Sequence, residues 1–536
     1  MSGDTDHANR GYTRREVVRG ALGAGAAFSA APLLAACGGG SSTPSSSGGG
    51  TGGAGSPKPG GDLRVGMLGG SSSDTLDAGR IVTEPDTIRA MALYSGLVRL
   101  SNDARSVEMD LAEEVTPSAD AKEWTVRLRQ GLTFHNGKPV TTDDVIFSLK
   151  RIVDPKSPGN GAAALAPLDV NAIKAMDART LRLPMKTPYA SFLDQICNIF
   201  NFPIVPTDYD PKNPVGTGPF KYQSFTPGQR SVFAKFPDYY LSGLPYLDSI
   251  TIIDNFASDT AAFNALQGGE LDVFSTAPLN LAKQIEGNSA LTALVSLPGQ
   301  WTPFTMRVDK APFTDNNVRQ AMRYIVDRQQ LIDLSLDGLG AVGNDVFSQW
   351  DPDYDTSLKR DQDLDKAKSL LKQAGQEGLT VELNTADFAV GVLQAAQVFA
   401  EQAKGAGVTV KVNQVPVGTF YGPNYLQWTF AQDFWGYSPY LSQVAQGSLS
   451  TAPFNETHWN DAQYVSLYNQ ANATTDDSKR KELVQEMQKI DFDQGGYIIA
   501  AYNKLLDITT SKVHGFEPAG TGIVLGNADW AHAWMS

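Results

Sequence analysis

Residues 379–412 read LTVELNTADFAVGVLQAAQVFAEQAKGAGVTVKV. The two ends of this stretch, 379–383 and 408–412, are rich in β-branched and apolar residues, as strands are. Between Phe388 and Lys404 the apolar residues recur at helical spacing. A strand, a helix and a second strand in this order form a crossover between parallel strands. The stretch therefore predicts an α/β fold in which helices cover a parallel sheet.

A second unit of the same kind lies about 130 residues earlier. Residues 250–253 form its first strand, a helix capped by Ser258 runs to Gln267, and residues 271–274 form its second strand. Two such units, well separated along the chain, predict two α/β lobes with a cleft between them.

Other elements follow from local patterns. Residues 62–67 and 124–129 alternate as half-buried strands do. Apolar residues at helical spacing predict amphipathic helices over 361–375 and 477–492, and a further helix over 318–336.

Composition excludes several classes of protein. The chain has 536 residues, a net charge of −14 and a pI near 4.9, which is the wrong sign for a nucleic-acid partner. Beyond the N-terminus no apolar stretch is long enough to cross a membrane. Two cysteines and five scattered histidines exclude a disulfide scaffold, a thiolate metal cluster and a zinc hydrolase. Cys197 lies in an apolar run, which predicts a buried thiol.

Three short motifs imitate ligand sites without their context. Residues 338–343 match G-x-G-x-x-G, but a predicted helix precedes them, whereas a dinucleotide site needs a strand there. The acidic runs 351–355 and 361–365 lack the Gly and the closing Glu of a calcium loop, so we interpret them as solvated acids at helix starts. No catalytic motif is present, and we expect no enzyme activity, cofactor or metal.

The N-terminus is typical of an export signal. Residues 1–36 contain Arg14 and Arg15 before seventeen uncharged, mostly small residues, and they resemble a twin-arginine signal peptide. The run Leu-Ala-Ala-Cys that ends at Cys37 resembles a bacterial lipobox, which implies cleavage before Cys37 and a diacylglycerol on its sulfur. Residues 37–61 are then a Gly/Ser-rich tether on the lipid.

Aromatic side chains crowd residues 428–440, next to glycines and prolines. Such a segment is loop-like, and loops between lobes line ligand sites. Packing in the core is the competing interpretation, because aromatic rings carry a large buried area.

The body of the chain resembles the dipeptide/oligopeptide-type extracellular solute-binding proteins of ABC importers, known as family 5 or cluster C. Five segments carry the resemblance in the same order along the chain: 124–148, 213–220, 268–272, 312–328 and 366–375. Each segment is modest alone, but five in order after a lipobox are specific.

This resemblance implies an α/β, bilobal, periplasmic-binding-protein-like (Venus-flytrap) fold with an extra inserted subdomain. Lobe I is expected to be discontinuous, and the subdomain is inserted into it. The expected division is 62–100, 216–310 and 505–536 for lobe I, 101–215 for the inserted subdomain, and 311–504 for lobe II.

The implied function is an extracellular substrate-binding receptor that captures a peptide or peptide-like solute and delivers it to an ABC permease and ATPase complex. The receptor is expected to be a monomer on the outer face of the bacterial cytoplasmic membrane, held there only by the lipid on Cys37. Alternatives are a receptor for a non-peptide solute such as an oligosaccharide or glycoside, a sensor subunit, and a secreted hydrolase. Scarce histidine argues against nickel.

Peptide-binding relatives carry a Trp-x-x-Asp-Tyr-type motif whose Asp meets the α-amino group of the ligand. Matching Tyr437 to that Tyr places Gly436 at the Asp position, with Asp433 three residues earlier. This departure indicates an aromatic, less charged pocket. The expected ligand-facing residues are Trp301, Phe304, Asp433, Trp435, Tyr437 and Trp459.

Overall fold

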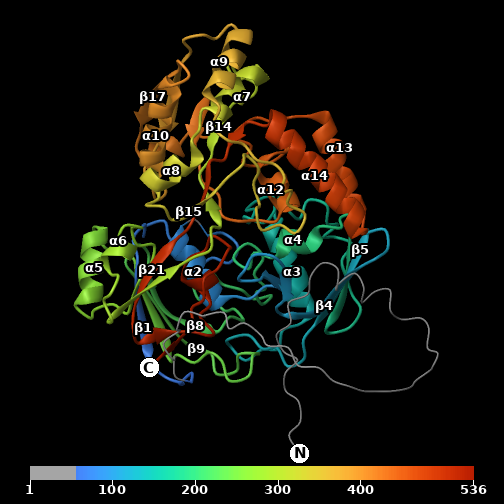
Figure 1. The fold of residues 1–536 in the computed structure, drawn as a ribbon. Coiled ribbons are helices and arrows are strands. Elements are labelled where there is room, and N and C mark those ends of the chain that lie inside the picture. The colour runs from blue at the N-terminus through green and yellow to red at the C-terminus, as the bar shows by residue number, and fades with distance from the viewer. Residues whose placement is uncertain (1–55, 82) are drawn as a thin grey trace, which may run out of the picture.

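The computed structural model describes residues 56–81 and 83–536. Two lobes lie one above the other in Figure 1, and a smaller subdomain lies beside the lower lobe. Arg14, Arg15 and Cys37, the predicted signal and lipid-bearing residues, lie outside the described residues. Within the described part, no helix combines the length and the apolar character that crossing a bilayer requires.

A five-stranded sheet forms the core of the upper lobe, here called lobe II. Its order is β17 (Thr409–Gln414), β16 (Thr380–Thr385), β18 (Phe430–Gln432), β14 (Phe304–Met306) and β19 (Tyr497–Ile498). β16 and β17 are parallel, and α10 (Val392–Lys404) connects them, which confirms the predicted crossover. The helix begins later than expected because Gly391, at φ +77°, forms its N-cap.

A seven-stranded sheet forms the lower lobe, here called lobe I. Its order is β12 (Leu291–Val295), β21 (Leu506–Thr510), β11 (Val273–Phe274), β1 (Asp62–Gly66), β10 (Ser249–Ile253), β9 (Arg230–Lys235) and β8 (Phe220–Thr226). β1 pairs in parallel with both β10 and β11, so the predicted second unit encloses β1 between its two strands. Its helix is α5 (Asp259–Gln267), capped by Ser258 as predicted.

The inserted subdomain has its own sheet and core. The sheet order is β4 (Ala112–Pro117), β5 (Glu123–Leu128), β7 (Thr180–Pro184) and β6 (Lys174–Ala175), with α3 (Thr142–Ile152) and α4 (Phe192–Ile196) packed nearby. A capping box between Thr141 and Asp144 starts α3. Cys197 is buried in this core, as predicted.

Small sheets and helices complete the two lobes. A three-stranded sheet, β13 (Gln300–Trp301), β20 (Ala501–Asn503) and β15 (Gly340–Val342), lies where the lobes meet (Figure 1). Two-stranded ladders pair β2 (Val98–Leu100) with β3 (Val107–Met109), and β22 (Val513–His514) with β23 (Trp534–Met535). The remaining helices are α2 (Glu84–Leu93), α6 (Leu281–Gln284), α7 (Asn316–Tyr324), α8 (Arg328–Ser335), α9 (Leu364–Gln373), α11 (Val417–Phe420), α12 (Tyr440–Gly447), α13 (Ala462–Ala473), α14 (Asp477–Gln494) and α15 (Val524–Ala528).

Two expectations about helices need correction. The single helix predicted over 318–336 is divided into α7 and α8, because the Asp327 side chain accepts the Gln330 N–H and starts a new helix there. Two of the three acids of the 351–355 run are buried, not solvated. Asp351 accepts the Tyr440 N–H at 2.8 Å, and it is buried together with Asp353.

The interpretations of the 361–365 and 338–343 motifs agree with the structure. Asp363 caps α9 by accepting the Lys366 N–H at 2.9 Å, as expected for an acid at a helix start. Residues 340–342 of the G-x-G-x-x-G match form strand β15, so the motif does not open a helix. Among the described residues, no group of three or more His, Cys, Asp or Glu side chains could hold a metal ion.

A buried ion cluster fixes α2 in lobe I. The Arg89 guanidinium is fully buried and donates to Asp74 at 2.9 Å and to Asp86 at 3.2 Å. It also contacts the carboxylate of Asp254, which follows β10. Because three carboxylates surround one guanidinium, the orientation of α2 against the sheet is strongly constrained.

Candidate functional site

A cleft of about 1180 Å³ lies between the two lobes. Its walls come from the loops that follow the carboxyl ends of parallel strands in both sheets: 68–69 after β1, 276–280 after β11 and 387–391 after β16. In open α/β sheets this edge is where ligands bind, because the loops there are free of the strand ladder. Asn160 and Phe200 of the inserted subdomain extend the cleft.

Three helices begin at the cleft. The first turn of α2 lines it with Thr83, Glu84 and Thr87, α5 contributes Asp259, and α10 contributes its N-cap Gly391. The amide groups in the first turn of a helix have no partner within the helix, so helix starts present polar groups to a ligand.

The carboxylate of Asp507 shapes the wall that follows β11. It accepts the Ser275 hydroxyl at 2.7 Å, the Thr276 N–H at 3.2 Å and the Leu525 N–H at 2.6 Å. These bonds hold Thr276 at φ +58°, a conformation that β-branched residues rarely adopt. Burial raises the pKa of Asp507 to about 6. The Thr276 hydroxyl oxygen is enclosed in the cleft wall and has no hydrogen-bond partner among the described residues.

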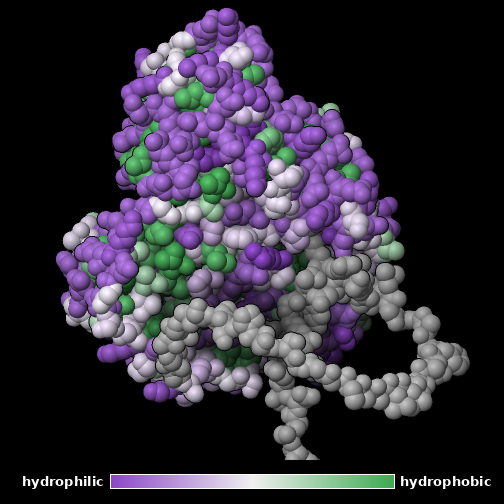
Figure 2. Space-filling view, in the orientation of Figure 1, coloured by the Kyte–Doolittle hydropathy of each residue, from purple (hydrophilic) through white to green (hydrophobic). Residues whose placement is uncertain are grey.

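Exposed apolar side chains concentrate on the lobe II side of the cleft. Leu334 is 61% exposed, Phe434 42% and Val417 41%, and all three line the cleft. Figure 2 shows hydrophobic surface where the upper lobe meets the lower left part of the molecule. Large apolar side chains left open to water in one hollow are typical of a binding surface.

All charged residues that line the cleft are acidic: Glu84, Asp259, Asp337 and Asp387. In the described part of the chain, none of these four side chains makes a hydrogen bond or an ion pair. Burial and the charge of Asp507 raise the pKa of Glu84 to about 7. Burial and the charge of Asp387 raise the pKa of Asp259.

Trp301 and Trp435 lie in a stack of four rings next to the cleft. The ring of Trp301 stacks on Trp435 at 5.9 Å and on Phe347 at 5.8 Å, and Phe347 stacks on Tyr440 at 4.9 Å. The backbones of Trp301 and Trp435 exchange two hydrogen bonds of 2.9 Å. Trp301 is buried and Trp435 half-buried, so this stack supports the segment that presents Phe434 and Gly436 to the cleft.

Asp433 is buried behind the cleft wall. Its carboxylate accepts the Tyr421 hydroxyl and the Phe434 N–H, both at 2.8 Å, and burial raises its pKa to about 6. Glu456 is buried beside it and accepts the Trp435 indole N–H at 2.9 Å. Burial and the charge of Asp433 raise the pKa of Glu456. Asp433 therefore acts on the cleft through Tyr421 and Phe434, which both line it.

The other three expected residues are buried in separate cores. Phe304 packs against Phe399 at 4.6 Å in the core of lobe II. Tyr437 packs with the core of the inserted subdomain. Trp459 is buried beside Tyr464. The structure thus brings Trp301, Trp435 and Asp433 together at one wall. Trp459 is buried in the same hydrophobic cluster as the two other tryptophans, whereas Phe304 and Tyr437 lie in other cores.

Several cleft residues were not singled out from the sequence. Phe434 belongs to the aromatic run 428–440 and lines the cleft, whereas the sequence favours its neighbours Asp433 and Trp435 as ligand-facing residues. Asp259 and Asp387 follow predicted strands. Their position after the carboxyl ends of these strands is the sequence signal that could have identified them as cleft residues.

Comparison with known families places the chain clearly. The model of the bacterial extracellular solute-binding proteins, family 5, matches residues 106–467. A glutathione-binding protein GsiB of Pectobacterium atrosepticum is 28% identical over 459 residues, which cover 80% of this chain and 86% of that protein. The dipeptide-binding protein of Escherichia coli is 26% identical, over 80% of this chain and 88% of that protein.

Solved structures share the fold over nearly their whole length. AgaA from A. tumefaciens, solved with agropinic acid, has a TM-score of 0.76 and 25% identity, over 89% of this chain and 99% of AgaA. DppA from Helicobacter pylori, solved with the peptide STSA, has a TM-score of 0.77 and 22% identity, over 89% of this chain and 98% of DppA. These likenesses confirm the expected periplasmic-binding-protein fold with its extra subdomain.

Proposed function

Because the chain belongs to the family 5 bacterial extracellular solute-binding proteins, which are non-enzymatic substrate-binding receptors of ABC importers, we propose that it captures a peptide or peptide-like solute between its two lobes and delivers it to the permease. The cleft of about 1180 Å³ carries this proposal, because both lobes line it and its volume suits a small peptide. A secreted hydrolase is no longer an alternative.

Solute binding is coupled to closure in this proposal. A solute that contacts the loops of both lobes binds the closed state more tightly than the open state, and this difference in affinity drives the closing motion. The permease then distinguishes the closed receptor from the open one. The three-stranded sheet of β13, β15 and β20 lies where the lobes meet and is the proposed place of bending. We propose the same division into lobe I, inserted subdomain and lobe II, with the boundary at 310 moved to before β14, because Phe304–Met306 belong to the lobe II sheet.

The residues proposed to contact solute are those whose side chains are open to the cleft, with Phe434 and Leu334 as the main apolar contacts. Trp301, Trp435 and Asp433 act from behind, by fixing the segment 433–436. In this assignment Phe304, Tyr437 and Trp459 stabilise the walls.

A peptide-like or non-peptide solute is a second candidate, favoured by Gly436. This residue lines the cleft where the resemblance places a carboxylate, so a free α-amino group finds no Asp there. A side chain would fit, because a Cβ at Gly436 would meet only the Thr521 carbonyl oxygen, at 3.8 Å. AgaA, whose structure contains agropinic acid, is an example of a related protein with a solute that is not a simple peptide.

We further propose that residues 1–36 are removed before Cys37, that Cys37 carries the lipid, and that residues 37–61 tether the receptor to the outer face of the membrane. The glycine- and serine-rich composition of the tether supports this arrangement. Mass spectrometry of the protein purified from its host should show a diacylglycerol on Cys37, and Cys37→Ala should release the receptor from the membrane fraction.

The central experiment identifies the solute. Mature protein is purified under native conditions and denatured, and the released small molecules are identified by mass spectrometry. Each is then returned to solute-free protein in a thermal unfolding assay, where a ligand at 100 times its Kd should stabilise by about 2.7 kcal/mol. A peptide or peptide conjugate is the expected result. An oligosaccharide would establish the non-peptide alternative, and failure of every released or added solute to stabilise would refute the receptor function.

A sensor subunit would bind solute in the same way, so a second measurement separates it from a transport receptor. Cross-linking of the solute-loaded protein in membranes should capture an ABC permease, and deletion of that permease should abolish solute uptake. Capture of a sensor kinase with unchanged uptake would favour the sensor.

A further inference from the structure

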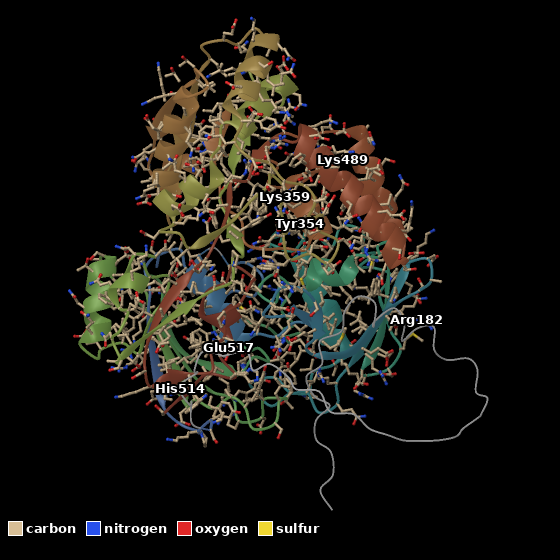
Figure 3. All side chains as sticks on the ribbon, in the orientation of Figure 1. Arg182, Tyr354, Lys359, Lys489, His514 and Glu517 are labelled. Atoms are coloured by element: carbon tan, nitrogen blue, oxygen red, sulfur yellow. The ribbon has the colours of Figure 1, made fainter. Side chains whose placement is uncertain are left out.

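The charged residues that line the cleft all carry the same sign. Glu84, Asp259, Asp337 and Asp387 line it, whereas no Lys, Arg or His among the described residues does. Arg182 and Lys489, two basic residues labelled in Figure 3, do not line it. The acids of the cleft therefore have no compensating positive charge within it.

Two of these carboxylates belong to opposite walls. Asp259 starts α5 of lobe I, and Asp387 lies between β16 and α10 of lobe II. Both carboxylates line the same cleft, one from each lobe. Closure of the cleft brings two negative charges closer together, and their repulsion opposes closure unless a positive charge lies between them.

Stabilisation of helix starts does not explain the whole arrangement. Acids in the first turn of a helix are favourable, and Glu84 and Asp259 lie in such turns. Asp337 follows the end of α8, and Asp387 precedes the N-cap of α10 by four residues. Neither is in a first turn, so these two carboxylates have no such role.

The cation that fits is organic. A bare metal ion needs several ligands gathered at one point, and no group of three or more suitable side chains exists among the described residues. Around the acids lie the exposed apolar side chains of Leu334, Val417 and Phe434. An ammonium or guanidinium group on a partly apolar body complements both features.

We propose that the solute is cationic and partly apolar, and that its positive group binds between Asp259 and Asp387, so that it links the two lobes on closure. This inference rests on the proposed receptor function and names the class of solute.

The test uses three probes that share one apolar body and differ in charge: leucyl-leucine amide (positive), its N-acetyl amide (neutral) and N-acetyl-leucyl-leucine (negative). Binding is measured by calorimetry on the solute-free mature protein at low ionic strength. The positive form should bind at least about tenfold more tightly than the neutral form, and the negative form should bind most weakly. Added salt should reduce the preference only in part, because the carboxylates are partly shielded from water.

Variants assign the effect to the two carboxylates. Asp259→Asn and Asp387→Asn should each weaken binding of the positive probe by about tenfold and leave binding of the neutral probe within about twofold. Asp361→Asn is the matched control, because Asp361 is an exposed carboxylate of lobe II that does not line the cleft. It should change neither value.

The solute released from the purified protein provides an independent result, and it should carry a positive charge. A neutral or anionic released solute that stabilises the protein would overturn the charge assignment and leave the receptor function intact. Equal binding of the three probes, or tighter binding of the neutral or negative form, would also overturn it. If none of the three probes binds, the charge of the solute released from the protein tests the charge assignment instead. If no solute of any kind binds, the receptor function itself fails.

Discussion

Replacing Phe434 by Ala should weaken solute binding by about 30-fold. The Phe434 side chain is 42% exposed in the cleft. A phenylalanine carries roughly 200 Å² of surface, so about 80 Å² of ring is available for a solute to cover. At about 25 cal/mol per Å², the loss of that contact corresponds to about 2 kcal/mol. The buried part of the ring packs against Phe388 at 5.9 Å and Tyr421 at 6.5 Å, so its removal also lowers stability, and affinity is compared well below the unfolding temperature of each variant.

The matched control is Phe454→Ala. Phe454 is 41% exposed and contacts the Trp435 ring edge-on at 6.0 Å, but it does not line the cleft. Calorimetric titration with the released solute measures affinity, and thermal unfolding without solute measures stability. The reasoning is refuted if Phe434→Ala binds within about 0.5 kcal/mol of the unmodified protein, or if Phe454→Ala loses as much affinity.

Three further predictions concern stability. Burial raises the pKa of Asp491 to about 7, so the folded protein binds an extra proton between about pH 4 and pH 7. Its free energy of unfolding should therefore fall by up to about 4 kcal/mol as pH rises through this window, and urea titrations should show a flatter profile for Asp491→Asn. Gly391 and Gly407 share a φ of +77°, but a Cβ at Gly391 would lie 2.3 Å from a backbone carbonyl oxygen, whereas at Gly407 nothing lies within 4 Å. In denaturant titrations Gly391→Ala should thus cost clearly more than the roughly 1–2 kcal/mol expected for Gly407→Ala, and equal costs would contradict this. Arg89→Met should destabilise by about 3–5 kcal/mol because it leaves buried carboxylates unpaired, whereas Arg127→Met, which breaks half-exposed ion pairs, should cost less than about 1 kcal/mol.

Local signals predicted much of the fold. The crossover through α10, the Ser258 cap of α5 and the capping box at Thr141 each depend on residues close together in the sequence. The position of β1 between β10 and β11 depends on pairing across nearly 190 residues, with Asp62 opposite Ser249, and no local pattern encodes it. The break between α7 and α8 was missed because the apolar spacing continues across the capping residue.

The site was harder to predict, for a geometric reason. In the extended segment 433–437 successive residues face opposite sides. Phe434 and Gly436 line the cleft, whereas Asp433 and Tyr437 are buried. Residue type favoured Trp435 and its odd-numbered neighbours, but type does not reveal which face of a strand is open. That information comes from the packing of the two lobes, which involves residues more than a hundred positions away.

The strand order of the lobe I sheet also affects how the protein folds. β21, at residues 506–510, pairs with β11 and β12, so lobe I remains without an interior strand until almost the entire polypeptide is available. In lobe II the first four strands of the sheet end by residue 432, and only the edge strand β19, at residues 497–498, comes comparably late. Contacts between such distant segments form slowly, because a long loop must close before they are gained. A lobe I sheet without β21 would expose the edges of β11 and β12, and exposed strand edges favour aggregation.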